Sequence, residues 1–305
     1  LIAAYGMLFT FPFQGYGLYS IGFSTLSIFT AYAFAIIYWR NINRVRQKSP
    51  GDPWFKAALF FNVVSSAGAF ALAIMMATKT AHPDRYLASS YFFLHFQYNG
   101  WFFFACMGLL IHKLHTWNIT LRRHKTIFWL FNLACVPAYF LSALWLPIPL
   151  WAYMLVIIAV VFQLSGFLMI LSALKKCVKQ LNPLIVPLGR WLLGLSGIAL
   201  TIKLLLQSGS IIPDLSKLAF GFRSIVIGYL HLVLLGVITL FILGYVVINQ
   251  YLHINKAAVT GIAVFVAGIF FNELILLVQG TAAISYISVP FTNERLFGAA
   301  ILLFA

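Results

Sequence analysis

Charged residues are scarce in this sequence, and acidic residues are the scarcest of them. Of the 305 residues, 8% are charged and 63% are apolar, and five Asp and Glu stand against 20 Lys and Arg. Soluble globular domains carry about 25% charged residues, so this chain has too few polar groups to cover a soluble particle. A soluble enzyme, a nucleic-acid-binding protein and a disordered protein are therefore excluded, and a polytopic membrane protein remains.

Cysteine is also rare, and its spacing excludes two further kinds of structure. The three cysteines, Cys106, Cys135 and Cys177, lie far apart and form no CxxC pair. The sequence therefore indicates neither a disulfide framework nor a cysteine metal site.

Long apolar runs are the main feature that the sequence does have. Runs of about 20 residues predict membrane-spanning helices, because a strand of a membrane barrel would need only about ten alternating residues. We expect an all-α, polytopic transmembrane helical bundle with eight full spans, at 17–39, 54–78, 86–111, 126–146, 150–174, 186–208, 222–249 and 257–280. Partial helices at 1–13 and from about 291 suggest that both ends are cut. The expected organisation is one transmembrane domain over residues 1–305, truncated at both ends.

The loops between these runs alternate in charge. Loops on one side carry 14 basic residues and one acidic residue, whereas loops on the other side carry five basic and three acidic residues. Because basic loops stay in the cytoplasm, the first side is predicted to be cytoplasmic. The expected partner is the lipid bilayer, without nucleic acid, and the expected location is the bacterial cytoplasmic (inner) membrane.

Four ionisable residues lie inside the predicted spans, where each costs several kcal/mol unless it is paired or faces a cavity. They are His95, Lys203, His231 and Glu273, and the loop charges place all four in the outer half of the membrane. We expect a shared polar pocket there, which also includes Asn99 and Gln207. Two further polar residues lie next to these candidates, namely Asn272 before Glu273 and Gln97 near His95. Structural roles stay open: interhelical hydrogen bonds for the histidines, snorkelling for Lys203, and a paired or protonated state for Glu273.

Two helical segments resemble the catalytic subunit of the haem-copper oxidase superfamily, especially its nitric oxide reductase branch. Residues 95–101 read HFQYNGW, and that branch has a metal-ligating His followed by Glu four residues later and then Gly. Here His95, Asn99 and Gly100 match this spacing, with Asn in place of Glu. Residues 228–236 read GYLHLVLLG and are similar to the GHxHLxxxG helix of the family, whose first His binds a high-spin haem and whose second binds a low-spin haem. His231 matches the second position, and Tyr229 stands at the first.

The resemblance implies a haem-copper oxidase subunit I-like fold, with His95 as a metal ligand and His231 as a ligand of a b-type haem. Tyr229 would take the high-spin position, as a Tyr does in catalase. The family's pair of active-site histidines has no counterpart, because the span at 126–146 contains no His. Since one imidazole cannot replace the three that hold this metal, the implied protein lacks a complete binuclear centre. Its implied function is electron transfer or haem-linked sensing.

Two other functions are compatible with the residues themselves. One is a proton or small-solute transporter or channel that uses the polar pocket, and the other is a non-catalytic subunit bound to other membrane subunits. A transporter needs a water-lined path to Glu273, Lys203 and His95, whereas a subunit needs a partner on its polar face. The sequence leaves open whether the protein is an enzyme.

Overall fold

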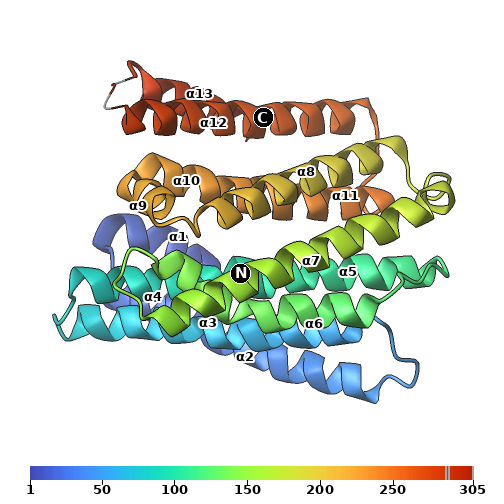
Figure 1. Cartoon of the computed structure of the whole chain (residues 1–305), viewed down its shortest axis with the longest axis horizontal. Coiled ribbons are helices and arrows are strands. Elements are labelled where there is room, and N and C mark those ends of the chain that lie inside the picture. Colours follow the sequence, from blue (N-terminus) through green and yellow to red (C-terminus); the bar gives the residue numbers. More distant parts are fainter. Residues whose placement is uncertain (286, 288, 304–305) are drawn as a thin grey trace. The chain divides into compact units, whose positions relative to one another are not determined.

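The computed structural model of the chain describes residues 1–285, 287 and 289–303, with the backbone alone at 218–219 (Figure 1). Every regular element among these residues is helical, which confirms the predicted all-α class. The chain divides into two compact units, unit 1 (Leu1–Ile170) and unit 2 (Leu171–Ala305). The single transmembrane domain expected over the whole chain stays a prediction.

Unit 1 is built on long helices joined by short loops. Its elements are α1 (Ile2–Gln14), α2 (Leu18–Arg44), α3 (Asp52–Ala77), α4 (Pro83–His95), η1 (Phe96–Phe102), α5 (Phe103–Thr116), α6 (His124–Cys135), η2 (Pro137–Ala143) and the first part of α7 (Leu150–Leu181). Helix α3 packs on α2, α4, η1 and α5, so it lies at the centre of this unit. Most large apolar side chains on α2 face outward, as expected of a helix in contact with lipid.

Aromatic side chains fill the core of unit 1. The ring of Trp54 is buried, and its centroid lies 5.4 Å from that of Phe104 and 5.2 Å from that of Phe128. Phe61 lies 5.1 Å from Phe104. Gly100 makes room for this packing, since a Cβ at that position would lie 2.6 Å from the Cβ of Phe61. Small residues allow the close backbone approach on which helix packing in membranes depends.

Unit 2 contains the end of α7 and the remaining helices. They are α8 (Pro187–Gly209), α9 (Pro213–Gly221), α10 (Arg223–His231), η3 (Leu232–Thr239), α11 (Leu240–Ile248), α12 (Lys256–Ile284) and α13 (Thr292–Leu302). Helices α10, η3 and α11 follow one another directly. Helix α8 packs on η3 and α11, and α12 packs on α10 and α13.

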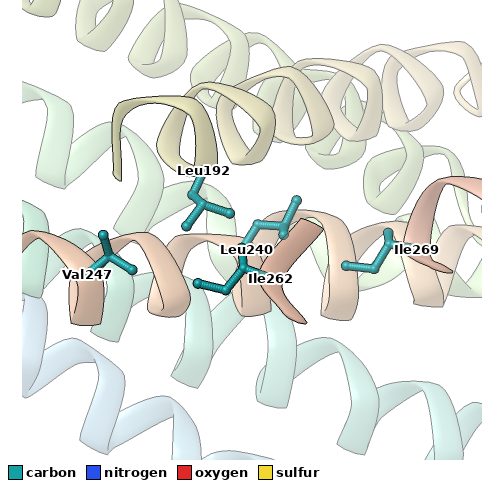
Figure 2. Packing of buried hydrophobic residues seen from close by; sticks show 5 residues of the cluster. All are labelled: Leu192, Leu240, Val247, Ile262 and Ile269. Atoms are coloured by element: carbon teal, nitrogen blue, oxygen red, sulfur yellow. The ribbon is translucent and has the colours of Figure 1, made fainter. Parts of the chain in front are cut away.

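Five aliphatic side chains form the buried core of unit 2, and we call them the apolar cluster. They come from α8, α11 and α12 and are Leu192, Leu240, Val247, Ile262 and Ile269. In Figure 2, Leu192, Leu240 and Ile262 lie together, with Val247 and Ile269 on either side. The apolar cluster therefore joins α8 to α11 and α12.

The number of membrane-spanning helices differs from the eight expected. Among the described residues, six helices are long and apolar enough to cross a membrane, and α6 with η2 would be a seventh. These two are bent by 43°, and Pro137 at the bend lacks the amide that would continue the α6 hydrogen bonds. The expected span at 86–111 corresponds to α4, η1 and α5, which are not among these six, whereas α10, η3 and α11 together count as one span. The eight spans are thus not confirmed, whereas a multi-pass, integral membrane protein agrees with the structure.

Candidate functional site

His95 is held at both nitrogens of its ring in unit 1. Its Nε2 lies 2.8 Å from the carbonyl oxygen of Cys135 and therefore donates to it, and its Nδ1 accepts from Nδ2 of Asn99 at 3.2 Å. The side chain is 1% exposed. A ring that donates at Nε2 and accepts at Nδ1 is the neutral tautomer. His95 thus links the end of α4 to α6 in the way of an interhelical hydrogen bond.

A metal at His95 would have to displace one of these two hydrogen bonds. Within the described part of the chain, no group of three or more His, Cys, Asp or Glu side chains could hold a metal ion. The ligand role implied by the resemblance stays a prediction, and the structure supports a packing role.

Other neutral polar side chains form hydrogen bonds between the helices of unit 1. Gln97 on η1 donates through Nε2 to Oδ1 of Asn62 at 3.1 Å and to Oγ of Ser65 at 2.7 Å, both on α3. Ser66 on α3 is hydrogen bonded to the hydroxyl of Tyr32 on α2. The sequence reasoning named Gln97 beside His95 but not its partners on α3 or the Tyr32–Ser66 pair, because neutral polar groups are common in membrane helices. The signal for the α3 residues was three polar side chains, Asn62, Ser65 and Ser66, within an apolar span.

His231 occupies an equivalent local setting in unit 2. It is the last residue of α10, and the π-helical turn η3 begins directly after it, just as η1 follows His95. A glycine lies five residues on in both cases, at Gly100 and Gly236. A Cβ at Gly236 would lie 3.1 Å from the Cβ of Ala199, so the π turn is where α8 approaches closely. Turns of this kind within α-helices are rare and occur often at functional sites.

A single amide bridges the two ionisable side chains of this setting. Nδ2 of Asn272 lies 2.7 Å from Nδ1 of His231 and 3.5 Å from Oε1 of Glu273. Asn272 is 5% exposed, whereas His231 is half-buried. The sequence placed Asn272 next to the candidate Glu273, but it did not reveal its contact with His231, which lies 41 residues away on another helix.

Lys203 lies at the level of His231 along the packed helices. Ser196 on α8 donates through Oγ to the carbonyl oxygen of Val237 on η3 at 2.7 Å. A Cβ at Gly244 on α11 would lie 3.2 Å from the Cβ of Leu192, so α8 runs antiparallel to η3 and α11. About two turns further along α8 is Lys203, and about two turns back from Val237 is His231. The side chain of Lys203 is buried, with 6% exposed. Interfacial snorkelling therefore does not describe this lysine.

Helix α12 brings its polar residues to the same level. A Cβ at Gly228 would lie 3.5 Å from the Cβ of Leu276, and one at Gly280 would lie 3.0 Å from Cγ1 of Ile225, so α12 runs antiparallel to α10. This register agrees with the direct bond between Asn272 and His231. We call Lys203, His231, Asn272 and Glu273 the polar layer of unit 2.

The remaining predicted site residues lie around these two settings. Asn99 contacts His95 in unit 1, whereas Gln207 is buried on α8, one turn beyond Lys203. Tyr229 stands two residues before His231, so the two side chains leave α10 about 200° apart and cannot approach one ligand from the same side. The structure thus brings Asn272, the neighbour of Glu273, to His231, and Asn99 to His95. One pocket shared by all these residues stays a prediction.

Comparisons with known proteins identify no relative. No family model, curated protein or solved structure matches the chain. The relationship to the haem-copper oxidases therefore stays a prediction from two short motifs, and the function has to be argued from the side chains.

Proposed function

We propose that this chain is a multi-pass membrane protein that binds and transfers protons at the polar layer of unit 2. One observation carries the proposal, namely the contact of the Asn272 amide with both His231 and Glu273. An imidazole gains or loses its proton near neutral pH, and a carboxyl group can both bind and release a proton. In this unit they lie on apolar helices, where an ionisable side chain costs several kcal/mol unless it is paired or faces a cavity.

The direction of these hydrogen bonds relates the charge states of the two groups. Because Asn272 donates to Nδ1 of His231, the neutral ring carries its proton on Nε2. The same amide donates to Oε1 of Glu273, which suits the carboxylate. The resting polar layer therefore contains a neutral imidazole, the carboxyl group of Glu273 and the buried Lys203.

When Nδ1 of His231 takes up a proton, the hydrogen bond between His231 and Asn272 has to change direction. A proton on Nδ1 needs an acceptor, so Asn272 has to turn and present Oδ1 instead of Nδ2. Glu273 then faces an oxygen and loses its donor, which favours the protonated carboxylic acid. In this way Asn272 couples protonation of His231 to protonation of Glu273, and the pair can take up and release protons together.

Proton flux into sealed vesicles tests this proposal. The purified protein is reconstituted with a pH-sensitive dye inside, and flux is driven by a membrane potential. We expect Glu273→Gln to lower the flux at least tenfold, because its amide cannot take up the proton. Glu294→Gln is the matched control, since Glu294 is exposed at the start of α13 and should leave the flux unchanged. Wild-type flux from a correctly folded Glu273→Gln variant would refute the proposal.

Haem ligation at His231 is the second candidate function, and the ring geometry supports it under one condition. The imidazole is held at Nδ1 by Asn272, and a hydrogen bond at one ring nitrogen commonly orients a histidine that ligates a metal through the other. A ligating Nε2 must be deprotonated, so Asn272 would have to present Oδ1 to an Nδ1–H group. A bound b-type haem would supply one-electron chemistry, consistent with electron transfer or sensing.

A pyridine haemochrome spectrum of the purified protein distinguishes the two functions. Haem ligation predicts a b-type spectrum that is lost in His231→Ala and retained in His253→Ala, a variant of an exposed loop histidine. A protein without haem that conducts protons supports the first proposal and excludes the second.

A further inference from the structure

Two buried polar atoms in unit 2 have no hydrogen-bond partner among the described residues. They are Oε1 of Gln207 on α8 and Oγ of Ser216 on α9. The side chain of Gln207 is 5% exposed and that of Ser216 is 2% exposed. Buried polar groups in proteins are almost always hydrogen bonded to protein or to ordered water. These two atoms therefore mark a place that accommodates a small hydrogen-bonding ligand.

Both atoms lie on one side of the polar layer. Gln207 follows Lys203 by four residues and thus lies one turn further toward the end of α8, on the same helix face. Helix α9 follows directly, and a Cβ at Gly209 would lie 4.0 Å from Cδ1 of Leu215, so the end of α8 lies against α9. Ser216 is the next residue of α9. The two atoms therefore lie between the polar layer and the α9 end of unit 2.

The apolar cluster lies on the opposite side of the polar layer. Ile269 precedes Asn272 by one turn of α12, and Leu192 precedes Lys203 by about three turns of α8. These residues and the other members of the apolar cluster are buried against one another (Figure 2). Among the buried residues of this cluster no side chain offers a hydrogen bond to a proton or to water.

We infer that the polar layer of unit 2 exchanges protons through water held by Gln207 and Ser216 at its α9 end, and that the apolar cluster closes the opposite end. The inference rests on the proposed proton function and adds its direction. An amide oxygen needs a donor, and Lys203 one turn away disfavours a cationic ligand, so water is the ligand that fits. By the loop charges, the α9 end faces the outside of the cell.

Cysteine accessibility tests this direction independently of proton flux. Ser216→Cys and Gln207→Cys are made in a background where the three native cysteines are alanine. Leu192→Cys and Ile262→Cys, both within the apolar cluster, are the matched controls. Sealed vesicles are treated on their predicted outer side with the membrane-impermeant sulfonatoethyl methanethiosulfonate. We expect the first two variants to react at least tenfold faster than the controls.

The labelling experiment tests the water path and the flux experiment tests the proton function, so each proposal can be contradicted without the other. Equal labelling of all four positions, or faster labelling of the controls, overturns one-sided access even if proton flux is normal. Labelled Ser216→Cys and Gln207→Cys in a protein without proton flux support the water path and overturn the proton function.

A leucine at position 207 provides a second measurement. Gln207→Leu removes the buried oxygen without leaving a partner unpaired, so the protein should fold with unchanged thermal stability. We expect its proton uptake to fall at least fivefold, because the leucine interrupts the water path. Unchanged uptake in this variant overturns the inference.

Discussion

Replacing either member of the Asn272–His231 pair by leucine should destabilise the protein, and the pair offers a measurable coupling. His231→Leu leaves the buried amide of Asn272 without its acceptor, and Asn272→Leu leaves the half-buried ring of His231 without its donor. An unsatisfied buried polar group costs about 1–3 kcal/mol. The donor and acceptor are 2.7 Å apart, and Asn272 is buried between α10 and α12. Interhelical hydrogen bonds in membrane proteins average about 0.6 kcal/mol and reach about 1.7 kcal/mol. We expect a coupling in the upper part of this range, at about 1–1.5 kcal/mol.

A double-mutant cycle measures this coupling. The free energy of unfolding in mixed micelles is determined for wild type, Asn272→Leu, His231→Leu and the double variant. The double variant should lose about 1–1.5 kcal/mol less than the sum of the single losses, because the second change removes a group that the first had already left unpaired. The same variants should show no proton flux, since each breaks the bridge between His231 and Glu273.

The control cycle pairs His231 with Asn249, which donates to the carbonyl oxygen of Tyr245 within its own helix segment. Asn249 lies 18 residues from His231 along a continuous helical run, about 27 Å away at 1.5 Å per residue. Changes at such distances add to within about 0.5 kcal/mol. The bridge would be refuted by an Asn272–His231 cycle that is as additive as this control.

Three further predictions concern packing, reactivity and orientation. Gly68→Ala should lower the free energy of unfolding by about 1–3 kcal/mol, because its Cβ would lie 2.6 Å from a backbone oxygen of α4. Gly194→Ala is the control, since the space around its Cβ is open, and it should leave the free energy of unfolding unchanged. Diethyl pyrocarbonate should modify the half-buried His231 and spare His95, as peptide mass mapping would show; equal modification contradicts the assigned hydrogen bonds. An engineered cysteine in the loop between α2 and α3 should react with an impermeant maleimide only after cell permeabilisation, and one between α3 and α4 should react before it; the reverse order contradicts the predicted orientation.

The sequence predicted the long helices well because their apolar runs are long and end at helix-capping or helix-breaking residues. The expected span at 257–280 lies within α12 (Lys256–Ile284), whose first turn is capped by the side chain of Asn255. Helix α7 begins at Leu150, the expected first residue of its span, directly after Pro149. Hydrophobicity and helix-ending residues are local properties, so a single sequence reveals them.

Features that depend on packing between helices were not predictable. The π-helical turns η1 and η3 follow His95 and His231, yet nothing in the residues of these turns distinguishes them from an α-helix. Their wider turns coincide with close contacts of Gly100 with Phe61 and of Gly236 with α8, which exist only in the folded chain. The sequence therefore predicted the runs at 86–111 and 222–249 without their π-helical segments.

The candidate site was half predictable for the same physical reason. Glu273, Lys203 and His231 stand out because a charge within an apolar run is costly wherever it lies. Asn272 can be seen beside Glu273 in the sequence, but a neutral amide is tolerated in a membrane helix, so its importance depends on what it contacts. Its bond to His231 joins residues 41 positions apart, and Gln97 contacts Asn62 across a similar separation. Such pairs can be read only from the arrangement of the helices.

The two histidines show how one local design can serve two purposes. Both end an α-helix, both precede a π turn, and both accept a hydrogen bond from an asparagine at Nδ1. In His95 the remaining ring nitrogen donates to a backbone carbonyl that cannot change its protonation, so the ring is fixed as a structural link. In His231 the bridging asparagine also contacts a carboxyl group, so any change in the ring's protonation alters the surroundings of a second titratable group. The chemistry of unit 2 therefore depends on the partner of the asparagine rather than on the histidine alone, and Asn272 is the residue whose replacement is most informative.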